Sequence, residues 1–217
     1  MLIVLEGLDG SGKSTQLALL QQWLAAQGIA PLTIKLPDYD DDSSVLVRQY
    51  LAGRFGSQPG DVNAYAASLF YAVDRYANYK LKWAQDYADS RVILADRYTT
   101  SNAYHQASKL PSEQWQSYFS WLEDTEYNKL SLPKPDLVIY LDMPIELSHM
   151  LTGKRGARDI HESANDYLAL CRKAALAAAA HYGWHIIPCA KDNKIRSIED
   201  IHDSIANHIR PRLTLQR

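Results

Sequence analysis

Residues 7–14 form a glycine-rich segment whose residue types and spacing suit the binding of phosphate groups. The segment reads Gly-Leu-Asp-Gly-Ser-Gly-Lys-Ser and matches the pattern G-x-x-x-x-G-K-[ST] without a gap. In such a loop the glycines let successive backbone N–H groups point at phosphate oxygens, and the helix that follows adds the positive end of its dipole. We therefore predict that the segment binds ATP or GTP, with Lys13 at the β- and γ-phosphates and the Ser14 hydroxyl on Mg²⁺.

Two further segments carry charges that suit a reaction between two phosphate chains. The apolar run 92–95 is followed by Asp96-Arg97-Tyr98, which puts a magnesium-side carboxylate beside a phosphate clamp at the end of a strand. Tyr71 and Arg75 are four residues apart on a predicted helix, so they share one face, where they could stack a base and hold its 5′-phosphate. The alternative for Arg75 is an ordinary surface position.

A basic loop follows later in the chain and predicts a short lid, approximately residues 152–162. It reads Lys154-Arg155-Gly156-Ala157-Arg158 and comes after an apolar strand and a short helix that begins at Pro144. Such a loop could close over the phosphates and bring arginines to the transferring group. A solvated basic loop is the alternative interpretation.

Signatures of other nucleotide-binding classes are missing from suitable places. A GTPase is expected to carry N-K-x-D and D-x-x-G motifs, and a motor or transport ATPase usually has a strand that ends in Asp-Glu or Asp-Asp. Here the strand ends in Asp96-Arg97 instead. This pattern favours a nucleotide kinase.

The rest of the sequence predicts the elements that position these residues. Five short apolar runs are expected to be buried strands, namely Leu2–Leu5, Pro31–Leu36, Arg91–Ala95, Leu137–Leu141 and Trp184–Pro188. Six longer stretches are expected to be helices, namely Lys13–Gln27, Ser44–Ala52, Val62–Tyr87, Ser112–Asn128, Ser163–His181 and Ile198–Ile209. Their alternation predicts an α/β fold with a doubly wound parallel five-stranded sheet, in a single domain of residues 1–217. The third helix is expected to bury one apolar stripe, made of Val62, Tyr65, Ala66, Leu69, Phe70 and Val73.

Composition and charge narrow the possible partners. The 217 residues carry a net charge of −2 with acidic and basic residues mixed throughout, which gives no support for a nucleic-acid surface. No stretch approaches the roughly 20 apolar residues of a membrane span, and a signal peptide is not expected. Cys171 and Cys189 have neither a metal-site spacing nor a disulfide framework, so we expect two buried or incidental thiols and a cytoplasmic location.

Together these segments resemble the bacterial thymidylate kinases over nearly the full chain. The resemblance is carried by residues 6–15, 36–39, 71–76, 96–103, 135–142 and 158–162. It implies a phosphate-binding-loop nucleoside monophosphate kinase that transfers the γ-phosphoryl group of ATP to dTMP with Mg²⁺, and that commonly pairs through its long helices as a homodimer.

The resemblance also implies site residues. The expected ATP-binding residues are Gly7, Asp9, Gly10, Ser11, Gly12, Lys13, Ser14 and Thr15. The expected dTMP-binding residues are Asp9, Tyr39, Tyr71, Arg75, Arg97, Asn102 and Gln106. Ser14, Asp96 and Asp9 are expected near the metal. The expected catalytic residues are Lys13, Arg97 and the lid arginines Arg155 and Arg158.

Several of these residues have a more specific implied role. Asp9 is expected at the sugar 3′-hydroxyl, Tyr71 on the thymine ring, and Arg75 and Arg97 on the acceptor phosphate. Asn102 and Gln106, by contrast, are expected at the base edge. Because the acceptor is a phosphate monoester that is mostly dianionic at neutral pH, no general base is required. Thymine differs from uracil by one methyl group, so dUMP is expected to be a poor alternative substrate.

Three positions depart from the family pattern. Asp38 stands where many relatives have a phosphate-binding arginine. Gly10 stands where eukaryotic-type relatives have an arginine, which leaves the catalytic cation to the lid. Either Tyr104 or His105 could align with the tyrosine that guards the 2′ position.

Two alternatives to this function stay open at this point. One is another nucleotide or deoxynucleoside kinase of the same fold, and a nucleoside kinase would need a carboxylate base, for which Glu6 is the candidate beside the loop. A catalytically weak nucleotide-binding regulator is the other alternative.

Overall fold

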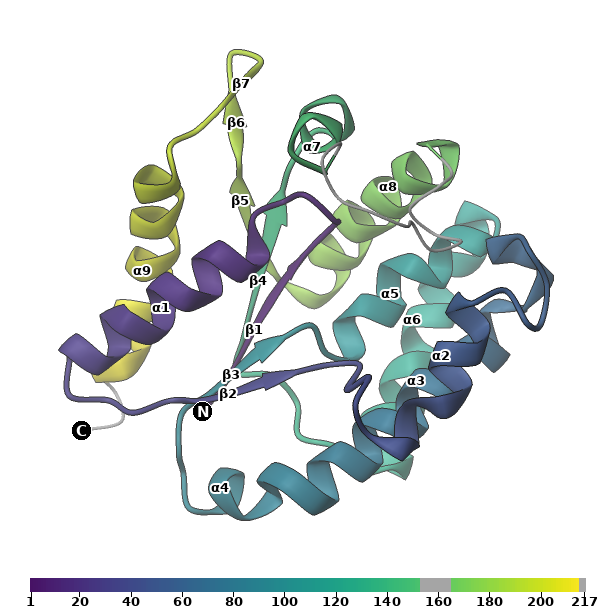
Figure 1. Ribbon diagram of the computed structural model, residues 1–217, viewed down its shortest axis with the longest axis horizontal. Coiled ribbons are helices and arrows are strands. Elements are labelled where there is room, and N and C mark those ends of the chain that lie inside the picture. Colours follow the sequence, from purple (N-terminus) through teal and green to yellow (C-terminus); the bar gives the residue numbers. More distant parts are fainter. Residues whose placement is uncertain (153–164, 215–217) are drawn as a thin grey trace.

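Five parallel strands form the central sheet of the protein, whose computed structural model describes residues 1–152 and 165–214 (Figure 1). The strands are β1 (Leu2–Gly7), β2 (Leu32–Lys35), β3 (Ile93–Asp96), β4 (Leu137–Asp142) and β5 (His185–Pro188). They lie in the order β2-β3-β1-β4-β5, and each corresponds to one predicted strand, so the predicted sheet is confirmed. Because all five strands run the same way, their carboxyl ends meet at one edge of the sheet, where ligands bind in such folds.

Helices cover both faces of the sheet (Figure 1). One face is covered by α1 (Lys13–Ala26) and α9 (Ile198–Thr214), and the other by α3 (Ala64–Asn78), α5 (Asn102–His105), α6 (Trp115–Glu123) and α8 (Asn165–Tyr182). Successive residues of β1 point to opposite faces: Leu2 and Val4 belong to the core on the α8 side, and Ile3 and Leu5 to the core on the α1 side. The remaining helices are α2 (Val45–Leu51), α4 (Ala84–Ala88) and α7 (Ile145–Thr152).

Two of the predicted long helices contain π-helical turns. The expected helix Val62–Tyr87 is α3, a π-helical segment Tyr79–Trp83 and then α4. The expected helix Ser112–Asn128 is a 3₁₀ turn at Ser112–Gln114, then α6, then a π-helical segment Asp124–Lys129. Apolar periodicity predicts the length of a helix, but it does not reveal a π-helical turn, whose hydrogen bonds span one residue more than those of an α-helix. Segments of this kind often occur at functional sites.

The prediction that α3 buries its apolar stripe is wrong for half of the stripe, because Val62, Ala66 and Phe70 are half-buried and the other three residues are exposed. Tyr65, Leu69 and Val73 are 37%, 45% and 55% exposed in the single chain. The face of α3 turned toward the protein carries small and polar residues instead, namely Ala64, Ala67, Ser68, Ala72, Asp74, Arg75 and Asn78. The helix packs closely through its small residues and presents the polar ones to the interior, which leaves Tyr65, Leu69 and Val73 exposed.

Several smaller features were not predicted. A two-stranded antiparallel hairpin, β6 (Ala190–Lys191) and β7 (Lys194–Ile195), precedes α9, and the four-residue helix α5 follows β3.

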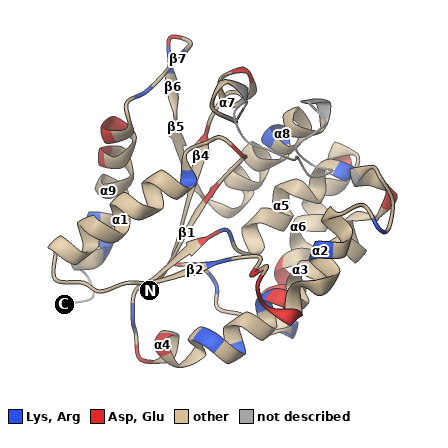
Figure 2. Ribbon diagram, in the orientation of Figure 1, with Lys and Arg blue, Asp and Glu red and all other residues tan. Residues whose placement is uncertain are grey.

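Cys171 and Cys189 are both buried free thiols, as expected. Acidic and basic residues are interspersed over the described elements (Figure 2). Within the residues that the structure describes, no helix is long and apolar enough to cross a membrane.

Candidate active site

The glycine-rich loop joins β1 to α1, which begins at Lys13. Gly10 and Gly12 have φ values of 78° and 89°, in the left-handed region that glycine adopts at little cost. Gly7 has no room for a side chain, because a Cβ there would lie 2.5 Å from the Ser11 hydroxyl oxygen. The glycines thus let the chain turn tightly onto the amino end of α1, where backbone N–H groups can bind an anion.

Lys13 lies inside the loop and is 9% exposed. Its Nζ donates hydrogen bonds to the carbonyl oxygens of Gly7 (2.7 Å) and Leu8 (3.1 Å). Burial, together with the nearby positive charge of Arg97, lowers the pKa of Lys13 to about 8. The negative charge of Asp9 acts in the other direction and favours the ammonium form, but its effect is smaller. A polyanion bound in the loop would therefore raise this pKa by stabilising the protonated amine.

Arg97 follows β3 and turns its side chain to the same loop. Its φ of 68° is uncommon for a residue other than glycine and costs about 1–3 kcal/mol. Nη2 donates to Asp9 Oδ1 (2.8 Å), and Nη1 donates to the hydroxyl of Tyr104 (2.9 Å). Burial alone would raise the pKa of Asp9, but Arg97 and Lys13 outweigh that effect and hold the pKa of this carboxyl well below its ordinary value. The three charges form one cluster at the loop.

The expected metal-side residues lie beside this cluster. Asp96 is the last residue of β3, and its buried Oδ1 accepts no hydrogen bond from residues 1–152 or 165–214. Ser14 is exposed in the first turn of α1. Oxygen donors of this kind suit Mg²⁺, which usually takes one or two carboxylates and completes its shell with waters and substrate phosphates. In keeping with such a partial site, no three described His, Cys, Asp or Glu side chains form a cluster that could hold a metal ion.

Arg75 has a partner that the sequence did not predict. Its Nε and Nη2 donate to the two carboxylate oxygens of Glu126 at 2.9 and 2.6 Å, and both side chains are buried. Burial disfavours the guanidinium charge, but the Glu126 carboxylate outweighs it and raises the pKa of Arg75. The Asn102 amide donates to the same carboxylate (3.4 Å). Arg75 is therefore held by a two-point ion pair, whereas the one ion pair of Arg97 among the described residues is with Asp9, which also lies 4.0 Å from Lys13.

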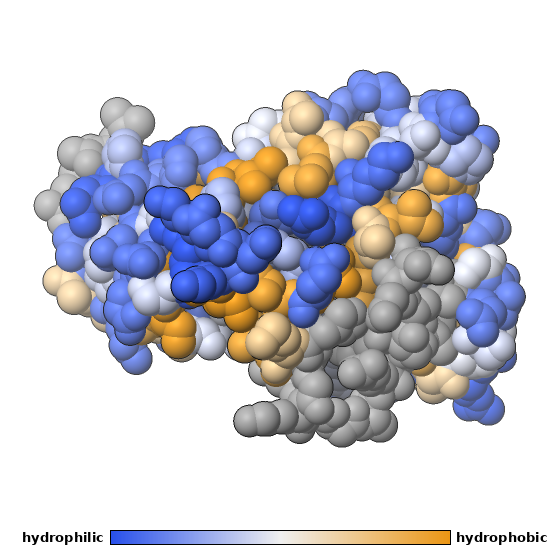
Figure 3. Space-filling model, turned by 90° about the horizontal axis from the view of Figure 1, so that it is seen from above, coloured by the Kyte–Doolittle hydropathy of each residue, from blue (hydrophilic) through white to orange (hydrophobic). Residues whose placement is uncertain are grey.

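A cavity of about 530 Å³ brings the expected residues together at the carboxyl ends of the strands. Those that line it are Asp9, Gly10, Ser11, Gly12, Lys13, Ser14, Thr15, Tyr39, Tyr71, Arg75, Asp96, Arg97, Asn102 and Gln106. Gly7 lies at the base of the loop and does not line the cavity, and the expected lid arginines Arg155 and Arg158 are outside the described residues. Seen from above, this end of the molecule carries hydrophobic as well as hydrophilic residues (Figure 3).

The cavity extends to both sides of the loop. On the β2 side it is lined by Pro37, Tyr39 and Tyr71, and on the α9 side by Arg196 and Ile198. A volume in this range accommodates small-molecule ligands. The loop therefore lies between two recesses, an arrangement that suits two nucleotides whose phosphates meet at Lys13 and Arg97.

The model of the family described as thymidylate kinase matches residues 5–205. The chain belongs to the thymidylate kinase family. It is 31% identical to a probable thymidylate kinase of Pyrococcus horikoshii over 204 residues, which cover 94% of this chain and 92% of that protein. It is 30% identical to the thymidylate kinase of Mycobacterium tuberculosis, with 85% and 87% of the two chains covered.

A solved thymidylate kinase from Candida albicans has the same fold. Its TM-score is 0.71 at 22% identity, with 97% of this chain and 91% of that chain covered. Archaeal and bacterial members of the family are thus similar to this chain in sequence, and a fungal member is similar to it in fold.

Asp38, the departure in the family's phosphate-binding segment, does not line the cavity. Its carboxylate accepts hydrogen bonds from Lys82 Nζ (2.6 Å) and Asn78 Nδ2 (3.0 Å), and its backbone N–H donates to Asp74 (3.3 Å). Ser43 also donates to Asp74, at 2.9 Å. Asp38 therefore fixes the segment after β2 to the helical run 64–88, and this holds the cavity-lining Pro37 and Tyr39 in place without supplying a cation.

The structure separates the two residues that could stand at the 2′ position. Tyr104 is fully buried and does not line the cavity, whereas His105 does. Their rings lie 4.5 Å apart, and His105 Nε2 is 3.3 Å from Arg97 Nη1. Of the two, His105 is the residue that a bound sugar can reach.

Lys35 and Glu126 are residues of this site that the sequence analysis missed. Lys35 ends β2 in register with Asp96, is exposed and lines the cavity, and its side chain makes no hydrogen bond or ion pair within the described part of the chain. Its place at the end of a predicted strand was a usable signal. Glu126 lies 51 residues from Arg75 in a π-helical turn, and no local pattern connects the two.

Proposed function

We propose that this enzyme is an ATP-dependent thymidylate kinase that transfers the γ-phosphoryl group of ATP to dTMP and gives dTDP and ADP for dTTP synthesis. The observation that carries the proposal is the single cavity in which Lys13, Asp9 and Arg97 form a charge cluster between two recesses. We place ATP on the α9 side and dTMP on the β2 side, where Tyr71 can stack on a base.

The chemistry requires charge neutralisation more than proton transfer. The 5′-phosphate of dTMP has a second pKa near 6, so at neutral pH its oxygen attacks without a base. Lys13 and Arg97 offset the repulsion between the two anions and orient them for in-line transfer. We propose that Arg155 and Arg158 supply further positive charge once both substrates are bound, as lid arginines.

The residues present fit Mg²⁺ as the cofactor. We propose that Ser14, Asp96 and, more distantly, Asp9 hold it, because one carboxylate oxygen of Asp96 has no hydrogen-bond partner among the described residues and needs a cation or its water. Bound Mg²⁺ supplies positive charge that neutralises the phosphates of ATP.

At the acceptor end we assign the phosphate of dTMP to Arg97. Of the two arginines expected there, Arg75 is already neutralised by Glu126, which also accepts a hydrogen bond from Asn102. We therefore propose that this neutral pair supports Asn102 at the base edge. The buried Oε1 of Gln106 has no hydrogen-bond partner among the described residues and lines the same cavity, so it is a second group for the base.

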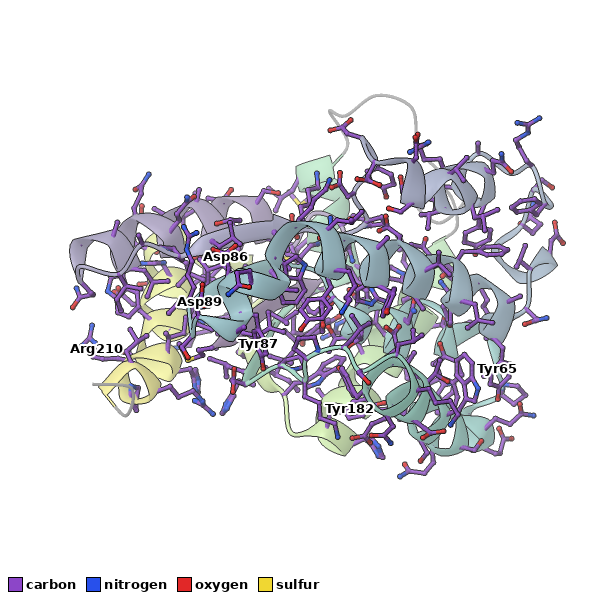
Figure 4. All side chains as sticks on the ribbon, turned by 90° about the horizontal axis from the view of Figure 1, so that it is seen from below. Tyr65, Asp86, Tyr87, Asp89, Tyr182 and Arg210 are labelled. Atoms are coloured by element: carbon purple, nitrogen blue, oxygen red, sulfur yellow. The ribbon has the colours of Figure 1, made fainter. Side chains whose placement is uncertain are left out.

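We also propose that two copies of the chain pair through α3 and that the enzyme works in the cytoplasm. Leu69, Val73 and Tyr76 are 45%, 55% and 40% exposed and follow i, i+4, i+7 spacing on one face of the helix. Tyr65 lies on the same helical run, at the end far from Asp86 and Asp89 (Figure 4). An exposed apolar stripe of this length suits burial against a second copy.

Sedimentation of Val73→Asp tests the dimer. We expect a dimer for the wild type and a monomer for the variant, whereas Leu170→Asp, at an exposed apolar position on α8, should stay dimeric. A monomeric wild type contradicts the proposal.

The activity is tested by ADP release from Mg-ATP with dTMP, dUMP, dCMP, AMP and thymidine as separate acceptors. We expect strong turnover with dTMP, weak turnover with dUMP, and none with thymidine because it lacks the acceptor phosphate. Turnover with thymidine would indicate a nucleoside kinase. Tight ATP binding without turnover on any acceptor would indicate a nucleotide-binding regulator.

A further inference from the structure

Glu6 is a fully buried carboxylate directly beneath the phosphate-binding loop. It does not line the cavity, so no substrate can reach it as a base. Oε2 accepts from the hydroxyls of Tyr104 (2.7 Å) and Ser101 (2.9 Å), and Oε1 accepts from Thr100 (2.6 Å) and from the backbone N–H of Tyr98 (3.2 Å). Charged acceptors make hydrogen bonds about twice as strong as neutral ones, and here every donor comes from the segment after β3.

That segment contains Arg97. The guanidinium Nη1 donates to the Tyr104 hydroxyl oxygen at 2.9 Å and lies 3.5 Å from the Ser101 hydroxyl. A phenol has one proton. Because Tyr104 gives that proton to Glu6, its oxygen must face Arg97 as an acceptor. Burial, together with the Glu6 charge, also raises the pKa of Tyr104, so the phenol keeps this proton.

The backbone of the same turn is held by neighbouring groups. Arg97 has a left-handed φ of 68°, its N–H donates to the carbonyl oxygen of Leu5 (3.2 Å), and the next N–H, that of Tyr98, donates to Glu6. A non-glycine residue keeps such a conformation only where its surroundings fix it. Glu6 therefore constrains Arg97 at two points, through the backbone of Tyr98 and through the side-chain hydroxyl of Tyr104.

We infer that Glu6 is a positioning residue for phosphoryl transfer, which acts through Tyr104 and Ser101 to aim the guanidinium of Arg97 at the acceptor phosphate. This inference rests on the proposed function. The Glu6 carboxylate accepts the proton of the Tyr104 hydroxyl, and the oxygen of that hydroxyl accepts a hydrogen bond from Arg97 Nη1. Asp9 holds Nη2 of the same guanidinium at 2.8 Å. The guanidinium is thus held in place before substrate arrives, and neither Glu6 nor Tyr104 touches a reacting atom.

The test is a double-mutant cycle between Tyr104→Phe and Arg97→Ala, with kcat and KM measured for dTMP and ATP and affinity for dTMP measured by calorimetry. Tyr140→Phe is the matched control, because it removes the hydroxyl of a second buried tyrosine whose ring lies 5.9 Å from that of Tyr104. Glu6→Gln is the companion variant. Thermal unfolding of each protein reports any loss of the fold.

We expect Tyr104→Phe to lower kcat/KM for dTMP by about 10- to 100-fold, because small misplacement of a positioning group has effects of this size. KM for ATP should change by less than about twofold, and the same substitution should have almost no effect once Arg97 is already alanine. Tyr140→Phe should keep wild-type kinetics.

Equal losses from Tyr104→Phe with and without Arg97, or an equal loss in Tyr140→Phe, would overturn the inference. If Glu6→Gln does not fold, the double-mutant cycle between Tyr104→Phe and Arg97→Ala still tests whether the Tyr104 hydroxyl acts through Arg97. A wild type that is inactive on dTMP contradicts the proposed function instead, and the calorimetric cycle for dTMP then tests the positioning of Arg97 separately.

Discussion

Arg97 and Arg75 line the same cavity, yet the protein neutralises them to different degrees. Arg75 forms a two-point ion pair with Glu126 that is buried on both sides. Among the described residues, Arg97 meets one oxygen of Asp9, which also lies 4.0 Å from Lys13, and its other side-chain contacts are with the hydroxyls of Tyr104 and Ser101 and the ring of His105. Arg97 thus makes one ion-pair contact, to a carboxylate that it shares with Lys13, whereas Arg75 makes two contacts to Glu126.

This difference teaches how one cavity can bind a nucleotide in a fixed direction. A guanidinium held by a single ion-pair contact keeps N–H groups that can donate to a phosphate. A cancelled pair offers hydrogen-bonding geometry without attracting an anion, which suits the neutral thymine base. The difference in ion pairing therefore assigns the phosphate to the Arg97 end of the cavity and the base to the Arg75 end. The following predictions test that assignment, from the largest expected effect to the smallest.

The largest effect is expected from Arg97→Ala. Loss of an arginine that acts on the phosphates should lower kcat with dTMP by about 10³-fold or more, while thermal stability changes little because Asp9 keeps Lys13 as a partner. Steady-state kinetics measure the loss. The control is Arg91→Ala, which removes a half-exposed arginine paired with Asp86 and should keep wild-type activity. A variant of Arg97 within tenfold of the wild type would contradict the assignment.

At the other end, Glu126→Gln should affect stability more than catalysis. Removing one partner of a buried ion pair leaves the Arg75 charge uncompensated and lowers the free energy of unfolding by about 3–5 kcal/mol. Urea unfolding measures it. Glu123→Gln, in an exposed pair with Lys134, should cost at most about 1 kcal/mol. If both variants lose the same amount, Arg75 does not depend on Glu126 for compensation.

Affinity for ATP should weaken at alkaline pH because of Lys13. Its pKa of about 8 in the empty protein lies below the ordinary 10.5, and bound phosphates favour the protonated form. Below pH 8 the amine is already charged and affinity is at its maximum. Above pH 8 binding must take up a proton, so Kd should rise about tenfold per pH unit until the pKa of the complex is reached. Calorimetry at pH 7 and 9 measures the change.

Lys109 provides the control for that titration. Burial lowers its pKa to about 8 as well, but it does not line the cavity. Lys109→Met should therefore keep the alkaline loss of ATP affinity. If the loss disappears in this variant, it does not come from Lys13.

The smallest effect is expected from Lys35→Gln. This exposed lysine lies in register with Asp96 and lines the phosphate end of the cavity, so its charge should contribute at most about 1 kcal/mol, or roughly fivefold, to dTMP binding. KM for dTMP should rise and KM for ATP should not. Lys80→Gln removes another exposed lysine, outside the cavity lining, and is the control. A larger rise in KM for ATP would place Lys35 on the donor side.

Local patterns predicted the parts of this protein that depend on neighbours in sequence. The strand, glycine-rich turn and helix around Lys13 were predictable because each follows from a few adjacent residues, and the five strands were predictable because buried parallel strands are almost entirely apolar. Asp96 and Arg97 were placed at a carboxyl end for the same reason.

The remaining features depend on contacts that are distant in sequence. Arg75 meets Glu126 across 51 residues, and only the packing of α3 against the π-helical turn after α6 brings them together. The stripe at Leu69 and Val73 has the periodicity of a buried face but lies outside, since periodicity shows that a face is apolar and does not show what covers it. The left-handed backbone of Arg97 could not be predicted from a motif either. A glycine in the sequence indicates that a left-handed conformation is possible, whereas an arginine does not.

The most direct test of this account compares the affinities of dTMP and thymidine for three proteins by calorimetry: the wild type, Arg97→Ala, and the double variant Arg75→Met/Glu126→Leu. In the double variant both charges are removed together, so that neither is left unpaired. We predict that Arg97→Ala reduces the preference for dTMP over thymidine by about tenfold or more, the worth of a charged hydrogen bond. The double variant should weaken both ligands alike and keep the preference. If the double variant loses the preference while Arg97→Ala keeps it, the phosphate lies at the Arg75 end, and the assignment of the two ends of the cavity is wrong.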